Sequence, residues 1–138
     1  MEKYMEIIIG KNAGFCYGVK RAVEGAKKEL ENLKKVYCLG ELVHNKEVIK
    51  DLEEKGLIKV DDIKKAEGTC IIRAHGELKE TYEKAKELNI NLVDFTCPNV
   101  LKNHKLVKEY YEKGYYTILL GTSTHPENIG TISYCDGY

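Results

Sequence analysis

Short runs of apolar residues alternate along the chain with longer segments of helical periodicity. The apolar runs predict strands over residues 5–10, 36–40, 70–73, 92–95 and 116–121, with a weaker strand pattern at 57–60. Between them, apolar positions three or four residues apart predict helices over residues 18–33, 46–55, 78–88 and 100–113. Repeated strand-helix-strand order predicts right-handed crossovers, and therefore an α/β fold with a mostly parallel sheet flanked by helices.

Residues at the expected element ends support these boundaries. Asn45 suits a helix N-cap, Pro98 suits a first helical turn, and Gly56 and Gly114 suit helix C-termini. The expected strands are apolar at consecutive positions, as a parallel sheet buried on both faces requires. The apolar stripe of the last expected helix is interpreted as core surface, and it comprises Val100, Leu101, Leu106, Val107 and Tyr110.

Composition narrows the class of protein. With 138 residues, the chain is about one ordinary domain long. Its 22 basic and 22 acidic side chains are interleaved, so charge gives no argument for a nucleic-acid or membrane partner. No apolar run is long enough to span a membrane, and no secretory signal pattern precedes the first apolar run. We therefore expect a cytoplasmic protein.

The five cysteines are odd in number and far apart, which argues against a disulfide framework. Cys38 and Cys70 lie within expected strands and are interpreted as small buried hydrophobes. Cys135 stays unassigned. Cys16 and Cys97 each lie between an expected strand and an expected helix, where a helix N-terminus lowers the pKa of a thiol. These two are candidates for a metal site or a nucleophile.

Three of the four histidines fall at the same edge of the expected sheet. His44 precedes a helix, and His75 and His125 each follow a strand. Such side chains can donate hydrogen bonds to an anion, and a diphosphate uses several of them. Glu127 is a candidate for proton relay at this edge. His104, inside a helical pattern, is predicted to be solvated.

The pattern of these residues leaves more than one class of function open. The sequence has no H-E-x-x-H, no Walker loop, no G-x-G-x-x-G and no nucleophile elbow, which disfavours hydrolase and nucleotide-binding functions. Two cysteines and a histidine could instead hold zinc in a non-catalytic α/β domain that binds a metal or a partner. A purely structural fragment without a cofactor is the third alternative.

Five segments resemble motifs of the 4-hydroxy-3-methylbut-2-enyl diphosphate reductase (IspH or LytB) family. Residues 14–22 are similar to its first cluster-cysteine motif and residues 96–98 to its second. Residues 43–45 and 74–76 are similar to its first two histidine motifs, and residues 125–131 to the third with its acid. The motifs occur in the family's order and nearly at its spacing over almost the whole chain.

The resemblance implies a role for each candidate residue. It implies a [4Fe-4S] cluster held by three cysteines, Cys16 and Cys97 among them, with one iron open to the substrate's hydroxyl oxygen. His44, His75 and His125 would hold the diphosphate, and Glu127 would support proton delivery as the catalytic residue. The implied reaction takes electrons from ferredoxin or flavodoxin and converts 4-hydroxy-3-methylbut-2-enyl diphosphate to isopentenyl and dimethylallyl diphosphates, in the non-mevalonate isoprenoid pathway.

Length is the main departure from that family, which has three similar α/β lobes. Residues 1–97 are expected to form the first lobe and residues 98–138 the start of a second. The third cysteine ligand and later diphosphate-binding residues have no counterpart, and Cys135 does not match that ligand in context. We therefore expect an incomplete fragment, inactive alone and with apolar surface that invites self-association.

Overall fold

Four short strands form one parallel sheet in this computed structural model, which describes residues 5–11 and 13–135. The strands are β1 (Val36–Leu39), β2 (Leu57–Val60), β3 (Thr69–Ile72) and β4 (Asn91–Asp94). Their order across the sheet is β2-β1-β3-β4, and each neighbouring pair is parallel. The predicted α/β fold is confirmed, and the carboxyl ends of all four strands lie at one edge of the sheet.

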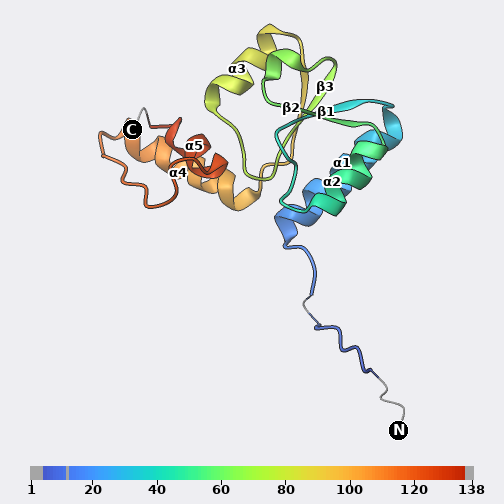
Figure 1. Cartoon of the computed structure of the whole chain (residues 1–138). Coiled ribbons are helices and arrows are strands. Elements are labelled where there is room, and N and C mark those ends of the chain that lie inside the picture. The colour runs from blue at the N-terminus through green and yellow to red at the C-terminus, as the bar shows by residue number, and fades with distance from the viewer. Residues whose placement is uncertain (1–4, 12, 136–138) are drawn as a thin grey trace.

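Helices connect the strands and cover both faces of the sheet (Figure 1). They are α1 (Tyr17–Asn32), α2 (Lys46–Glu54), α3 (Lys79–Glu87), α4 (Pro98–Glu112) and α5 (Pro126–Ile132), with a short 3-10 turn, η1 (Ile63–Lys65). The first four helices were predicted to within two residues at each end. The sequence pattern did not predict α5 or η1. None of the described helices combines the length and apolar content that a bilayer crossing requires.

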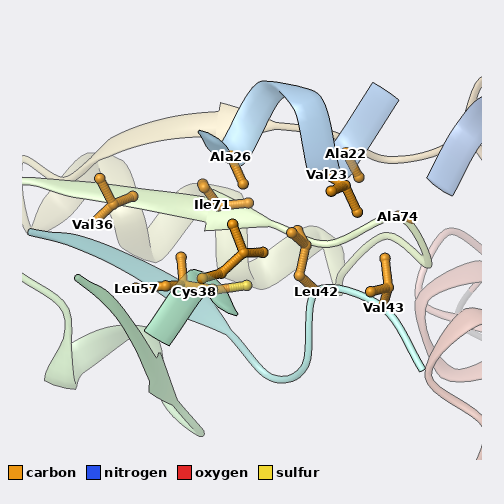
Figure 2. Close-up of a cluster of buried hydrophobic side chains, with 11 residues drawn as sticks. Ala22, Val23, Ala26, Val36, Cys38, Leu42, Val43, Leu57, Ile71 and Ala74 are labelled. Atoms are coloured by element: carbon orange, nitrogen blue, oxygen red, sulfur yellow. The ribbon is translucent and has the colours of Figure 1, made fainter. Parts of the chain in front are cut away.

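Alternation along β1 divides the core into two layers. Val36 and Cys38 face α1 and α2, in a cluster that also takes in Ala22 of α1 and Ile71 of β3 (Figure 2). Tyr37 faces the other way, into a cluster built with residues of η1, β3 and α3. Because consecutive residues of one strand are buried on opposite faces, the apolar runs in the sequence are explained.

The two strand cysteines belong to this core, as predicted. Cys38 and Cys70 are both fully buried. Burial raises the pKa of the Cys38 thiol to about 12 and that of Cys70 to about 11. Both thiols therefore stay protonated near neutral pH and act as small hydrophobes.

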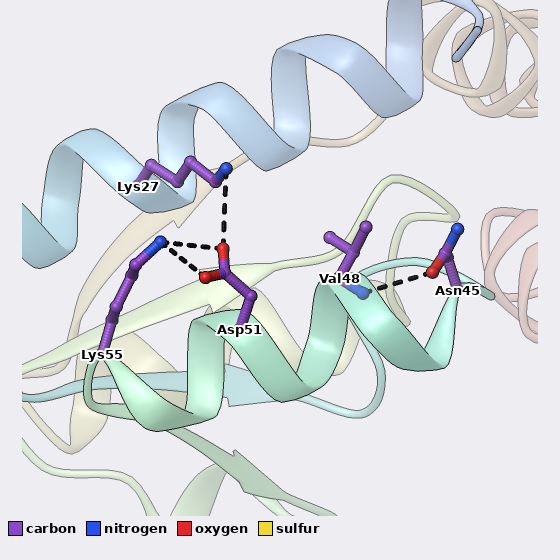
Figure 3. A network of polar contacts seen from close by, with 5 residues as sticks. All are labelled: Lys27, Asn45, Val48, Asp51 and Lys55. Carbon is purple, nitrogen blue, oxygen red and sulfur yellow. Dashed lines mark hydrogen bonds and ion pairs between the residues drawn. The ribbon is translucent and has the colours of Figure 1, made fainter.

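Polar contacts cap the start of α2 and link α2 to α1 (Figure 3). The Asn45 side chain accepts a hydrogen bond of 3.2 Å from the Val48 amide, so the predicted N-cap is confirmed. Farther along, the Asp51 carboxylate pairs with Lys55, the C-cap residue of α2, and with Lys27 on α1. These exposed pairs add little stability, but they join the two helices on one face of the sheet.

Two predicted strands are absent from the structure. Residues 5–10 and 116–121 form no strand, and residues 5–10 extend away from the sheet (Figure 1). Their apolar side chains are exposed, with Ile8 at 82% and Ile118 at 86%. A strand needs a neighbouring strand to bond its backbone, and none of the described residues supplies one to either segment.

Two predictions about α4 are also wrong. His104 was predicted to be solvated but is only 3% exposed. In the apolar stripe interpreted as core surface, Val100 is buried, whereas Leu101, Leu106 and Tyr110 are each more than 40% exposed. The helix therefore packs through Val100 and His104 and leaves much of its apolar surface open.

Candidate functional site

The carboxyl edge of the sheet gathers the candidate residues from three loops. His44 lies between β1 and α2, His75 between β3 and α3, and Cys97 between β4 and α4. Since the three strands are parallel, these loops emerge at the same edge. Ligands of open α/β sheets bind at such an edge.

The three predicted histidines come together there. The ring centroids of His44 and His75 are 4.6 Å apart, and those of His75 and His125 are 5.6 Å apart. His44 and His125 are 6.3 Å apart by the same measure. Three imidazoles from three separate loops can thus contact a single small anion.

His75, half-buried between the other two rings, is held in its neutral form. Burial, and to a lesser extent the nearby charges of His44, His125 and Arg73, together lower the pKa of His75 to about 4. The buried Nε2 atom of His75 has no hydrogen-bond partner among the described residues. A buried polar atom without a partner is costly, and a ligand bound here would satisfy it.

The His125 ring is oriented by the start of α5. Its Nδ1 atom accepts a hydrogen bond of 3.3 Å from the Glu127 amide. A neutral imidazole whose Nδ1 accepts carries its proton on Nε2, so that N–H is free to donate. Glu127 lies in the first turn of the same helix and is half-buried. His125 and Glu127 therefore both lie at the N-terminus of α5.

Arg73 directly follows β3 and lies against Gly40, which directly follows β1. The Arg73 Nη2 atom lies 2.8 Å from Oε1 of Glu77, and both side chains are largely buried. The guanidinium also lies against Gly40, where a Cβ atom would be only 2.2 Å from Nη1. This ion pair belongs to a cavity of about 490 Å³ that is lined by neither His44 nor His75. The histidine cluster is thus separate from this cavity.

Both candidate thiols lie at the N-terminal turn of α1. Cys16 is the N-cap residue of this helix and is exposed. Cys97 is the N-cap residue of α4, but its Sγ atom lies against Gly18, where a Cβ atom would be only 2.7 Å away. A larger residue than glycine at position 18 would displace Cys97. Gly18 therefore allows the two cysteines to approach one another.

One face of α1 holds the segment that ends at Cys97. The Arg21 guanidinium donates hydrogen bonds to the carbonyl oxygens of Thr96 at 2.9 Å and Asp94 at 3.1 Å. The Phe95 ring covers Gly25, where a Cβ atom would overlap it. The sequence interpretation missed this role of Arg21 and Gly25. The spacing of Gly18, Arg21 and Gly25 along one helical face was the available signal.

No complete metal site is present among the described residues. Within that part of the chain, no three Cys, His, Asp or Glu side chains are placed to hold one metal ion. A zinc site built from two cysteines and a histidine therefore finds no support there. Cys16 and Cys97 thus have no third metal ligand beside them among the described residues.

The site is built on an internal repeat. Cys16 precedes His44 by 28 positions, and Cys97 precedes His125 by the same 28. In each case a long helix begins directly after the cysteine and a second helix begins within two residues of the histidine. At this spacing, residues 117–120 correspond to β1, although no strand forms there. The second half of the chain thus begins as a copy of the first.

Comparisons with known proteins point to a single protein family. The family model described as LytB protein matches residues 7–138. The 4-hydroxy-3-methylbut-2-enyl diphosphate reductase of Alkaliphilus oremlandii is 44% identical over 135 residues, and that of Caldanaerobacter subterraneus subsp. tengcongensis is 45% identical over 138. Each match covers 96% of this chain and 48% of the relative. The chain therefore spans about half the length of these relatives.

Solved structures agree with the sequence matches. The E-1-hydroxy-2-methyl-but-2-enyl-4-diphosphate reductase of Plasmodium falciparum superimposes with a TM-score of 0.88 at 35% identity, over 91% of this chain and 41% of that one. A structure of (E)-4-hydroxy-3-methyl-but-2-enyl diphosphate reductase gives a TM-score of 0.81 at 38% identity, over 95% and 48% of the two chains. Fold, motifs and family model agree, and the chain belongs to the LytB protein family.

Proposed function

We propose that this chain forms the amino-terminal half of a 4-hydroxy-3-methylbut-2-enyl diphosphate reductase. The observation that carries the proposal is the convergence of three histidines on one edge of the sheet. It occurs in a chain 44% identical to a relative with that name. The reaction removes the substrate's hydroxyl group and gives isopentenyl and dimethylallyl diphosphates.

The histidines bind the substrate's diphosphate. His125 offers an Nε2–H, and His75 has a buried nitrogen without a partner among the described residues. His44 is exposed, and its ring lies beside that of His75, where it can contact the same diphosphate. A diphosphate has enough acceptor oxygens to use all three rings.

Cys16 and Cys97 are two of the three ligands of a [4Fe-4S] cluster. The residues present fit such a group, because Gly18 makes room for Cys97 beside the helix that Cys16 caps. Cysteine thiolates are the usual ligands of such clusters. When bound, the cluster supplies electrons, received from ferredoxin or flavodoxin, and an open iron for the hydroxyl oxygen. The third ligand comes from elsewhere in a longer protein.

Glu127 delivers a proton to the leaving hydroxyl group. It lies two residues after His125, in the first turn of α5, so it shares the diphosphate site. A general acid must lie within hydrogen-bond reach of the group it protonates. The half-buried position of Glu127 is compatible with this role.

The internal repeat supports a division into lobes. Residues 1–97 make the first α/β lobe, and residues 98–138 begin a second, in which α4 and α5 correspond to α1 and α2. Residues 117–120 then become a central strand once later residues pair with them. When those residues are not present, the exposed apolar segments favour self-association. A cytoplasmic location fits this assignment and stays a prediction.

Binding of inorganic diphosphate tests the histidine assignment on this chain directly. Isothermal titration should detect binding by the wild-type chain. His75→Asn and His125→Asn should each weaken it by about 10- to 100-fold, the range for losing a hydrogen bond to a charged group. Lys28→Gln removes an exposed charge from α1 and is the control. Equal affinities for all four proteins would exclude this site.

A further inference from the structure

His104 is a buried titratable residue that the proposed function does not use. It lies on α4, and neither of its ring nitrogens has a hydrogen-bond partner among the described residues. Burial lowers the pKa of His104, against a smaller opposite effect of Asp94, so the ring is neutral near pH 7. Its counterpart in the first repeat is Val23, an ordinary core residue of α1. Packing alone therefore does not require a histidine here.

The His104 ring joins elements that carry the site. It stacks on Tyr134, just after α5, with centroids 4.7 Å apart and planes 23° apart. A Cβ atom at Gly76 would lie 2.9 Å from its Cε1 atom, so the turn that carries His75 packs directly on the ring. A Cβ atom at Gly130 would lie 3.6 Å from Nε2, so α5 also packs on it. The His104 ring thus contacts both the turn that carries His75 and α5, the helix that begins directly after His125.

Two glycines make this close approach possible. Gly76 has a positive φ of 78°, which glycine adopts without strain, and a side chain there would also meet Thr96 and Val100. Gly130 is buried in α5, with the Glu77 carbonyl oxygen 3.3 Å from where its Cβ would lie. The turn, α4 and α5 are therefore fixed against one another around His104.

We propose that His104 is a positioning residue that sets the placement of His75 relative to His125. His44 is anchored in the first lobe by its buried neighbours Leu42 and Val43. His125 comes from the other half of the chain, and the His104 ring holds that half against the His75 turn. This inference rests on the proposed diphosphate site, where a misplacement of about 1 Å can cost about a hundredfold in function.

The first test compares binding of inorganic diphosphate by four forms of the chain. His104→Ala removes the ring and should weaken binding about tenfold or more. His104→Phe keeps a ring against Tyr134 and should recover most of that affinity. Val23→Ala truncates the equivalent core position of the first repeat and should bind like the wild type. Unchanged affinity in His104→Ala, or an equal loss in Val23→Ala, would overturn the proposal.

The second test reports the geometry without any ligand. Nuclear Overhauser contacts between the ring protons of His75 and His125 should be present in the wild type and Val23→Ala, and lost in His104→Ala. Retained contacts in His104→Ala would overturn the positioning role. If the contacts are present in the wild type and lost in His104→Ala, but the wild type binds no diphosphate, the proposed function is contradicted while the role of His104 is supported.

Discussion

His75 shows how the fold prepares a single residue for an anion. Burial and the neighbouring His44, His125 and Arg73 all disfavour its cationic form. A bound diphosphate would reverse the effect of these neighbours, because its negative charge favours the imidazolium. Binding at this site should therefore take up protons.

The pKa of His75 predicts how stability depends on pH. The folded ring takes up a proton only near pH 4, whereas the unfolded side chain does so near pH 6.5. The free energy of unfolding should therefore fall as pH decreases from about 6.5 towards about 4, by at most about 1.4 kcal/mol per pH unit for this residue. Urea titrations at several pH values measure it. A His75→Gln variant should lose less stability over this window, and an equal loss would contradict the assignment.

Gly18 predicts a coupling between the two cysteine-bearing helices. Gly18→Ala should destabilise the chain by about 1–3 kcal/mol, because the new methyl group meets the Cys97 sulfur. In a Cys97→Ala background the sulfur contact is gone and only the milder contact with the residue-97 Cβ, at 3.1 Å, is left. Alanine is also the better helix former by about 1 kcal/mol, which offsets that remaining contact. The same substitution should then be nearly neutral. Thermal denaturation of the wild type, both single variants and the double variant gives the double-mutant cycle. An equal loss of stability from Gly18→Ala in both backgrounds would exclude the contact.

Among the elements, α1 does the most to place the site. Its buried face carries Gly18, Arg21 and Gly25 against the segment that leads from β4 to Cys97. Its other contacts are with the sheet and α2. The helix therefore links the first-lobe core to the start of the second lobe.

Arg21 tests this role of α1. Arg21→Met keeps the aliphatic stem but removes the hydrogen bonds to Thr96 and Asp94, so unfolding free energy should fall by about 1–3 kcal/mol. Lys20→Met, on the exposed face of the same helix, is the matched control and should stay within about 0.5 kcal/mol of the wild type. Chemical denaturation measures both. A loss confined to Lys20→Met would contradict the account.

The sequence pattern predicted elements whose partners lie within the chain. All four strands of the sheet and the four longer helices were recognised, since periodicity reflects burial on each face. Residues 5–10 and 116–121 have the composition of strands but lack a neighbouring strand among the described residues. The seven-residue α5 was too short for its periodicity to be visible. His104 was assigned to solvent from its residue type, because its contacts with Gly76 and Tyr134 are distant in sequence.

The candidate site was predictable in part for the same reason. The three histidines were expected together because His44 precedes a helix and His75 and His125 each follow an expected strand at one edge of the sheet. The strand expected before His125, residues 116–121, does not form. The role of Arg21 and the contact between Gly18 and Cys97 were not predicted, because the partners lie more than 70 residues away. Local patterns locate an edge of a sheet, but they do not identify the long-range contacts that orient side chains there.

At the scale of the whole molecule, exposed apolar segments predict self-association. Ile8, Ile118 and Leu120 are each at least 82% exposed. Unpaired apolar segments of this kind associate with other chains. Light scattering should detect species larger than a monomer, and Ile118→Lys with Leu120→Lys should reduce them. Leu88→Lys, at an isolated exposed leucine, is the control. A wild-type chain that remains monomeric at all concentrations would contradict this prediction.

The central claim is that these residues supply half of a reductase active site. The most direct measurement joins residues 1–138 to the complementary carboxyl-terminal half of the Alkaliphilus oremlandii relative. Oxidation of dithionite-reduced viologen by 4-hydroxy-3-methylbut-2-enyl diphosphate is then followed under anaerobic conditions. The account predicts substrate-dependent oxidation that Cys97→Ser abolishes. A folded, iron-loaded fusion without any such activity would contradict it.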